Sequence, residues 1–336
     1  MGFRASETHG TTPPMLKPLL LAAAILAVPA TAQEPDRRSP NEIVAAAPAS
    51  DWVPIASSDL LVMTLAPDAK GKPRQVVIQL MPPPFSQGWV ENIRTLAKAG
   101  WYDGLSINRV QDNYVVQWGD PDGEDAAKAK KLPAGLVEVA KDAYLISCSR
   151  ESRKDFVTLT HHCNHGDNMP EVALVKDVYA KASFFHSGWP FATSLLENWP
   201  VHCYGMVGVG RGMPPDTGSG AELYTVIGHA PRHLDRNIAL VGRVVEGIEH
   251  LSSLPRGTEA LGFYRTAEER VPIRTIRFAS DLPQAEQPRF QYLSTESQTF
   301  AAYAEARANR RDPFFIQPAG GADICNIPVP VRRVAG

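Results

Sequence analysis

The sequence has 336 residues, of which 44% are hydrophobic and 21% are charged, and this excludes disorder along the whole length. The formal net charge of −2 gives no indication of nucleic-acid binding, so we expect no nucleic-acid partner. Many prolines stand in short clusters, such as Pro82–Pro84 and Pro214–Pro215. This pattern is typical of a loop-rich β protein rather than a helical bundle.

The N-terminus carries the pattern of a targeting signal. Lys17 precedes the apolar run Pro18–Val28, and Ala30–Ala32 supplies an A-x-A cleavage pattern. We therefore expect residues 1–32 to be a signal peptide, Met15 to be the true start, and the protein to be periplasmic or secreted. The run is too short to span a bilayer, so no stable membrane insertion is expected after cleavage. The alternative is an anchor that is never cleaved.

Four cysteines follow this segment, namely Cys148, Cys163, Cys203 and Cys325. In an oxidising compartment an even number indicates two disulfides, with three possible connectivities. Cys148 and Cys163 are close in sequence, so we prefer Cys148–Cys163 together with Cys203–Cys325.

The first half of the chain reads as strands around one helix. Residues 33–54 are rich in Pro and Ala and are expected to form a linker. A hairpin is predicted next, and then a helix with Ser86 as its N-cap and Gly100 at its end. The helix is indicated by apolar residues at helical spacing: Trp89, Val90, Ile93, Leu96 and Ala97. The four predicted strands are Asp59–Ala66, Gln75–Met81, Leu105–Val110 and Tyr114–Trp118.

The segment 126–200 is longer and more polar than the other connections between strands, and we interpret it as an insertion between core strands. Strands are predicted after it at Cys203–Gly210, Glu222–Ile227, Ala239–Val245 and Ile273–Ala279. A short helix is predicted at Ile248–Leu254. Together with the first half, these elements predict a mainly β fold, a closed barrel capped by two helices. Closure removes edge strands, which suits a secreted monomer.

Residues 283–336 form a C-terminal extension in which one helix is predicted at Phe300–Arg310. Thr295 and Gln298 fit a capping box ahead of it. If Cys325 pairs with Cys203, the tail is fastened to the core domain.

A conspicuous motif surrounds Arg109. Ile107–Asp120 reads I-N-R-V-Q-D-N-Y-V-V-Q-W-G-D and resembles the cyclophilin pattern F-H-R-V-x-x-x-F-M-x-Q-G-G-D. Ala221–Gly228 resembles the family's S-Q-F-F-I strand. His229–Asp235 and Val241–Gly247 resemble its later L-D-G loop and F-G-x-V-x-x-G strand. The resemblance covers about residues 55–282, interrupted by the insertion. It implies a closed eight-stranded cyclophilin-like barrel and a peptidyl-prolyl cis/trans isomerase that assists the folding of exported proteins.

The reaction explains why an arginine is needed. Rotation about a peptide bond has a barrier of about 18–20 kcal/mol, and no bond is broken, so no metal, cofactor or nucleophile is required. A cation that hydrogen-bonds the prolyl nitrogen favours the twisted amide, and arginine is always charged. The resemblance assigns the catalytic arginine to Arg109 and the glutamine that orients it to Gln117. It assigns contacts with a proline-containing polypeptide to Tyr114, Val115, Glu222, Tyr224, His233, Leu234, Gly210 and Arg211.

Other interpretations compete at this stage. Asn108, Trp118 and Ile238 depart from the family pattern and favour a non-catalytic peptide-binding or chaperone module on the same fold. Arg109 could instead be a structural arginine paired with Asp103, Asp120 or Glu222.

Three further motifs suggest a metal site, a nucleotide loop and a catalytic dyad, but each has a simpler structural explanation. Thr160–Asp167 (THHCNHGD) holds ligand types for zinc or copper, but they crowd one loop, which favours a solvated loop. Gly208–Gly212 resembles a nucleotide loop but is followed by prolines where a helix should start. His202 and Cys203 are adjacent, so in a strand they face opposite sides and cannot form a catalytic dyad.

Overall fold

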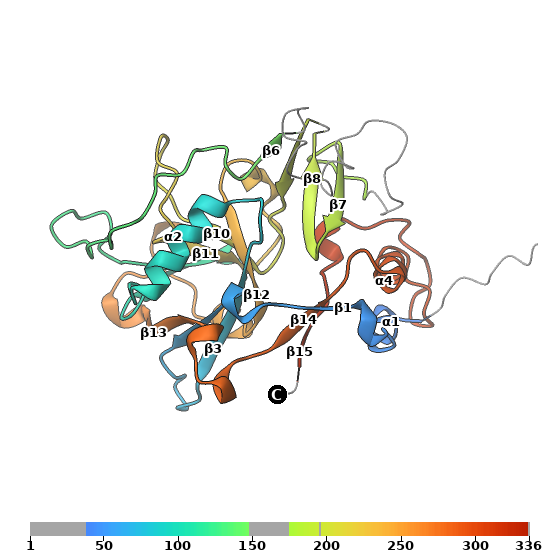
Figure 1. Ribbon diagram of the computed structural model, residues 1–336, viewed down its shortest axis with the longest axis horizontal. Coiled ribbons are helices and arrows are strands. Elements are labelled where there is room, and N and C mark those ends of the chain that lie inside the picture. The colour runs from blue at the N-terminus through green and yellow to red at the C-terminus, as the bar shows by residue number, and fades with distance from the viewer. Residues whose placement is uncertain (1–37, 148–174, 195, 335–336) are drawn as a thin grey trace, which may run out of the picture. The chain divides into compact units, whose positions relative to one another are not determined.

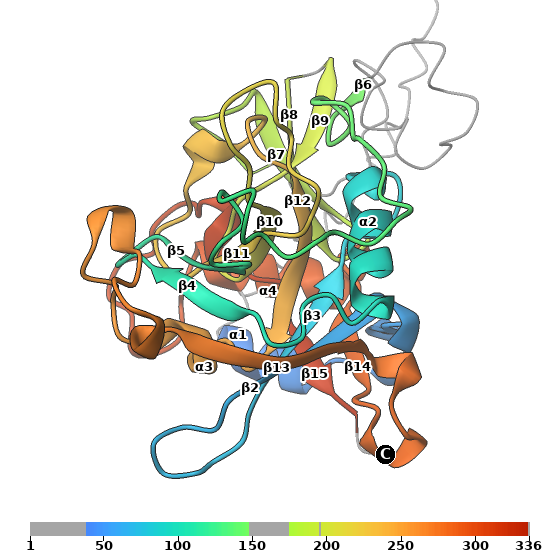
Figure 2. The same ribbon diagram turned by 90° about the vertical axis from the view of Figure 1, so that its left-hand side faces the viewer.

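The computed structural model describes residues 38–147, 175–194 and 196–334. The described residues include a closed antiparallel barrel, in which the strands follow the order β10-β11-β5-β4-β13-β2-β3-β12 (Figures 1 and 2). This confirms the predicted mainly β fold with an eight-stranded barrel. The strands are β2 (Leu60–Leu65), β3 (Arg74–Leu80), β4 (Ser106–Val110), β5 (Val115–Gly119), β10 (Met206–Val209), β11 (Leu223–Val226), β12 (Leu240–Glu246) and β13 (Val271–Phe278).

The predicted hairpin is formed by β2 and β3, with Leu61 opposite Ile78. Ile78 belongs to the main core, whereas its neighbour Val77 belongs to a second apolar cluster that includes Phe290 of the C-terminal extension. Both faces of β3 are therefore buried, which explains why its sequence is apolar at consecutive positions.

Two helices adjoin the barrel, as predicted. Helix α2 (Gln87–Lys98) contacts β12 and β13, and Gly100 follows it with φ +63°. Ser86 is the N-cap residue, but it has φ 59° and its hydroxyl accepts no capping hydrogen bond. Helix α3 (Glu249–Ser252) contacts β3 and is shorter than the predicted Ile248–Leu254.

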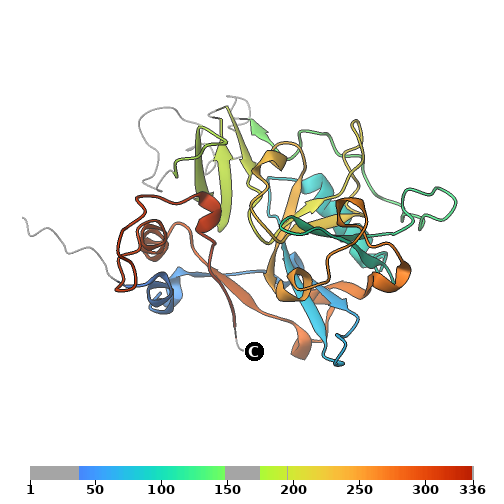
Figure 3. The same ribbon diagram turned by 180° about the vertical axis from the view of Figure 1, so that it is seen from behind.

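The insertion forms a sheet of its own among the described residues, with strand order β6-β9-β8-β7 (Figures 1 and 3). Its strands are β6 (Ile146–Ser147), β7 (Ala182–His186), β8 (Trp189–Thr193) and β9 (Glu197–Pro200). Phe191 on β8 stacks on Phe85, just before α2, with ring centroids 4.5 Å apart. This sheet thus packs against the segment that leads into α2.

A third sheet joins the two ends of the described chain, in the order β1-β14-β15. Its strands are β1 (Trp52–Pro54), β14 (Phe290–Leu293) and β15 (Val331–Arg333). Residues 40–54, inside the expected linker, therefore hold a strand and also helix α1 (Pro40–Ala45), which contacts helix α4 (Gln298–Ala308). A capping box between Ser39 and Glu42 starts α1.

Helix α4 confirms the helix predicted in the extension, but its cap differs. Ser297, not Thr295, is the N-cap, and its hydroxyl accepts from the Phe300 amide. Cys203 and Cys325 form the expected disulfide, which joins residues 122 positions apart. Cys203 is therefore no nucleophile.

Several expectations fall outside the described residues, namely the signal peptide 1–32, Cys148, Cys163 and the segment Thr160–Asp167. Within the described ranges, no helix has the length and apolar character needed to cross a membrane. The same ranges contain no group of three His, Cys, Asp or Glu side chains that could hold a metal ion.

Candidate active site

Arg109 and Gln117 lie opposite each other on the paired strands β4 and β5. The register between these strands shifts between Ile107 and Arg109, and such a bulge re-aims the side chain that follows it. Arg109 Nη1 donates to Gln117 Oε1 at 2.9 Å. The structure therefore brings together the two residues that the sequence assigned to catalysis.

Two further groups fix the Arg109 guanidinium, and neither was predicted. Nη2 donates to Gln111 Oε1, and Nε donates to the Leu261 carbonyl at 2.7 Å. Gln111 is two positions after Arg109, so a strand pattern could have placed it on the same face. Leu261 is 152 positions away, in the short 3₁₀ helix Ala260–Gly262, and has φ +58°. No local sequence pattern indicates that its carbonyl would meet Arg109.

Two aromatic rings flank the same guanidinium. The Arg109 Cζ lies 5.6 Å from the centroid of the Tyr114 ring and 5.4 Å from that of Phe263. Such cation–π contacts contribute about 0.5–1 kcal/mol each at partly exposed sites. Burial lowers the pKa of Arg109, but an arginine so placed stays charged near neutral pH. Arg109 is thus a fixed cation whose direction is set by five neighbouring groups.

Glu222 extends this chain of hydrogen bonds. Gln117 Nε2 donates to Glu222 Oε1 at 2.7 Å, so the amide of Gln117 bridges the carboxylate and Arg109. Burial raises the pKa of Glu222, although the bond from Gln117 opposes the shift. Among the described residues, Arg109 and Glu222 make no direct ion pair, because Gln117 lies between them. The alternative in which Arg109 is a structural arginine paired with Glu222 is therefore not observed.

Gly210 and Arg211 lie on the other side of Glu222. A Cβ on Gly210 would come within 2.8 Å of the Glu222 side chain, so a larger residue here would displace that carboxylate. Arg211 is partly buried and donates to the Asn237 carbonyl from Nε and Nη2 at 3.2 and 3.0 Å. All three residues line a cavity of about 740 Å³, which also contacts Asn108 and Phe263 beside Arg109.

Four residues assigned to substrate contacts, Tyr114, Val115, Tyr224 and Leu234, belong to one apolar cluster next to Arg109. Its members are the buried Val115, Tyr224 and Val226 and the partly buried Tyr114, Leu234 and Ile238. His233 stacks on the Tyr114 ring at 6.2 Å with an interplanar angle of 13°. The strand predicted at Tyr114–Trp118 is β5, which begins one residue later; Tyr114 lies in this cluster, whereas Val116 and Trp118 belong to the main core.

Tyr224 is anchored from behind by a buried polar network. Its hydroxyl lies 2.9 Å from His202 Nε2, and His202 Nδ1 lies 2.8 Å from Asp235 Oδ1. Because a carboxylate only accepts, Nδ1 carries the proton and Nε2 accepts from Tyr224. Arg232 donates to both Asp235 and Asp177, at 2.6 and 2.7 Å. Burial raises the pKa of Tyr224 well above its ordinary value, so the hydroxyl stays protonated.

Comparison with known proteins agrees with this geometry. Residues 76–278 match the family described as cyclophilin type peptidyl-prolyl cis-trans isomerase/CLD. The chain belongs to the cyclophilin family.

One solved structure has the same fold. The crystal structure of cyclophilin AquaCyp293 from Hirschia baltica is similar over 89% of this chain and 98% of that one, with 19% identity and a TM-score of 0.59. A cyclophilin type peptidyl-prolyl cis-trans isomerase of Cryptosporidium parvum matches 65% of this chain and 96% of its own, with 12% identity and a TM-score of 0.36. No curated protein matches in sequence.

Three of the positions at which this cyclophilin departs from the family pattern, Asn108, Trp118 and Ile238, do not obstruct the arginine. Trp118 is fully buried in the main core and so does not reach the site. Asn108 is also buried, donates to the Gly119 carbonyl at 3.1 Å and accepts from Ser106 at 2.6 Å. Ile238 packs against the apolar cluster and adds to its wall.

Proposed function

We propose that this cyclophilin catalyses cis/trans isomerisation of X–Pro bonds in exported polypeptides and so assists their folding. The observation that carries the proposal is the arrangement of Arg109. Its guanidinium is held by Gln111, Gln117 and the Leu261 carbonyl, beside an apolar cluster that suits a proline ring. These bonds use three of its five N–H groups, which leaves donors for a substrate.

Isomerisation of an X–Pro bond requires no group beyond a fixed cation and an apolar pocket. X–Pro bonds isomerise in tens to hundreds of seconds without catalysis, because amide resonance must be lost at the transition state. As resonance is lost, the prolyl nitrogen regains its lone pair and becomes an acceptor. A cation that donates to it stabilises the twisted amide over the planar one, which is the difference that accelerates a reaction. Prior orientation by Gln111 and Gln117 reduces the reorganisation that this step requires.

A proline-limited refolding assay with Arg109→Ala tests the proposal. A hydrogen bond to a charged group contributes about 1.5–3 kcal/mol, so the substitution should lower kcat/KM about 10- to 150-fold. Arg94→Ala is the matched control, because Arg94 lies on α2 and bonds Asp59 and the Ser58 carbonyl away from the site. Equal rates for the wild type and Arg109→Ala would refute the catalytic role.

The exported location has its own support. Residues 1–32 have the pattern of a signal peptide, and the Cys203–Cys325 disulfide suits an oxidising compartment such as the periplasm or the cell exterior. N-terminal sequencing of the protein from fractionated cells tests this location. We expect a mature chain that begins near Gln33 in the exported fraction, and an uncleaved chain in the membrane fraction would contradict it.

A further inference from the structure

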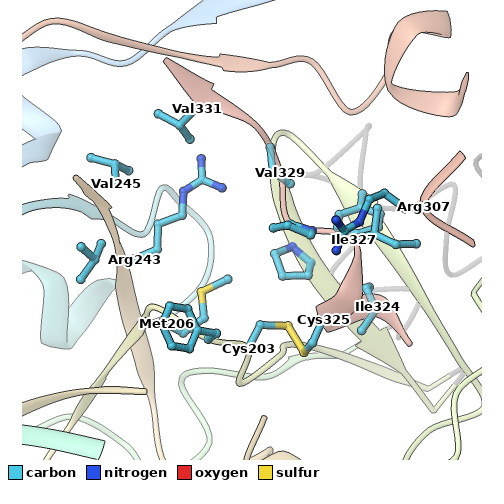
Figure 4. Close-up of a pocket in the computed structure, with 15 residues that line it drawn as sticks. Cys203, Met206, Arg243, Val245, Arg307, Ile324, Cys325, Ile327, Val329 and Val331 are labelled. Carbon is cyan, nitrogen blue, oxygen red and sulfur yellow. A yellow bond between two sulfur atoms is a disulfide. The ribbon is translucent and has the colours of Figure 1, made fainter. Parts of the chain in front are cut away.

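A separate cavity of about 380 Å³ lies where barrel strand β12 meets the insertion sheet, α4 and the C-terminal segment (Figure 4). Seven of its fifteen lining residues come after residue 278, where the match to the family model ends. The cavity shares no lining residue with the 740 Å³ cavity beside Arg109. Nearly half of its lining therefore lies outside the match to the family model, and its occupant need not be a peptide.

The charges around this cavity are of one sign. Arg243 and Arg307 line it, on opposite sides in Figure 4, and none of its lining residues is acidic. Its walls are otherwise mainly apolar, with Met206, Ile327 and Val329 between the two arginines. An apolar space with cations at its edge is complementary to an amphipathic anion.

Arg243 is a buried cation without a counter-charge among the described residues. It is 7% exposed, donates from Nε to Gln79 Oε1 at 2.9 Å and donates from Nη1 to the Gly188 carbonyl at 2.6 Å. Both acceptors are neutral, and Nη2 has no partner within the described part of the chain. Burial lowers the pKa of Arg243 to about 10, which still leaves it charged at neutral pH.

The aromatic neighbours of Arg243 offset only part of the free-energy cost of burying its charge. Its Cζ lies 4.4 Å from the Trp189 ring centroid and 5.8 Å from that of Tyr292, so both rings make cation–π contacts with the guanidinium. The desolvation penalty of a buried ion is larger than such contacts recover. A bound anion would supply the missing charge and an acceptor for Nη2.

We propose that this cavity binds a small monocarboxylate with a short apolar chain. The carboxylate pairs with Arg243, and the chain lies against Met206, Ile327 and Val329. Nη2 is shielded from solvent in the structure, so pairing requires the guanidinium to turn toward the ligand. The volume lies at the lower end of the range of about 300–1,000 Å³ for small-molecule sites, which favours a short chain.

Calorimetry of the full chain with hexanoate and with hexanamide, its neutral analogue, tests the proposal. We expect saturable binding of one hexanoate per chain and at least about tenfold weaker binding of hexanamide. Arg243→Met should remove this preference for the acid. Arg109→Ala should leave hexanoate binding unchanged, so the result does not depend on isomerase activity.

A second variant keeps the proposal falsifiable if Arg243→Met does not fold. Val329→Trp fills the cavity from the C-terminal segment without touching Arg243, and it should abolish binding of both compounds. Arg94→Ala serves again as a control that retains binding. Absence of saturable hexanoate binding, equal affinity for acid and amide, or unchanged binding by Val329→Trp would each overturn the proposal.

Discussion

Glu222 should make catalysis depend on pH, and Glu222→Gln should remove that dependence. At neutral pH the carboxylate accepts from Gln117 Nε2 and thereby turns Gln117 Oε1 toward Arg109. Burial raises the pKa of Glu222, so the carboxylate takes up a proton at a higher pH than an exposed glutamate would. Protonation weakens its acceptor oxygen and loosens the orientation of Arg109.

The expected size follows from the two kinds of hydrogen bond. A bond to a charged acceptor contributes about 1.5–3 kcal/mol and a neutral one about 0.5–1.5 kcal/mol, a difference of about 1 kcal/mol. This corresponds to about fivefold in kcat/KM. The wild type should lose about this factor as pH falls through the raised pKa of Glu222. Glu222→Gln should show the lower rate already at neutral pH and remain flat.

Stability should change in the opposite direction. Because the folded-state pKa of Glu222 is raised, the folded chain binds the proton more tightly than the unfolded chain. The stability from this group is thus fully present below its ordinary pKa and is lost as pH rises through the raised value. Glu222→Gln should consequently be more stable than the wild type at neutral pH, and this advantage should vanish in acid.

The measurements are kcat/KM for an X–Pro peptide and urea unfolding, both followed from about pH 4 to about pH 8. Gln291→Glu, on strand β14 of the three-stranded sheet, is a control that adds a carboxylate away from the site. If Glu222→Gln keeps the pH profile of the wild type, another group controls it, and the bridge from Glu222 through Gln117 to Arg109 has no catalytic role.

Three further outcomes are expected. Replacing Cys203 and Cys325 by serine should lower the free energy of unfolding by up to about 5 kcal/mol, since the disulfide closes a loop of more than 100 residues; an unchanged urea midpoint would contradict this. Asp235→Asn removes one of the two carboxylates that pair with buried Arg232; because Asp177 remains, it should cost about 1–3 kcal/mol in the same experiment, and an unchanged urea midpoint would show that the pair is unimportant. Tyr224→Phe leaves a buried histidine nitrogen without its donor and should cost about 1–3 kcal/mol, while peptide affinity, measured by titration, should fall only slightly because the ring remains.

Local patterns were sufficient to locate the barrel strands β2 to β5 and the hairpin that carries Arg109 and Gln117. Alternating apolar residues and turn-forming stretches predict where β2, β3, β4 and β5 lie to within a few residues. Once β4 and β5 form a hairpin, Arg109 and Gln117 are neighbours by register. These features depend on residues close in sequence, which is why they could be read from it.

Features that depend on distant residues could not be read in the same way. The pairing of β1 with β14 joins Trp52 to Leu293, and nothing in the short segment around Trp52 specifies that partner. The same holds for the Leu261 carbonyl that accepts from Arg109. Trp118 departs from the family pattern, and only the assembled barrel shows that its strand turns this side chain into the core.

The way in which Arg109 is held bears on whether this cyclophilin is an enzyme or only a peptide-binding module. A binding module needs the apolar cluster around Tyr224 and Val115, and it does not need a guanidinium held at three points. Fixing Arg109 has an entropic cost that peptide affinity alone does not require, since a hydrogen bond to a planar amide tolerates a mobile donor. A twisted amide presents its acceptor in one direction, and a fixed donor stabilises it selectively. The restraint on Arg109 therefore favours catalysis, and an Arg109→Ala variant that binds proline peptides normally but isomerises them slowly would separate the two roles.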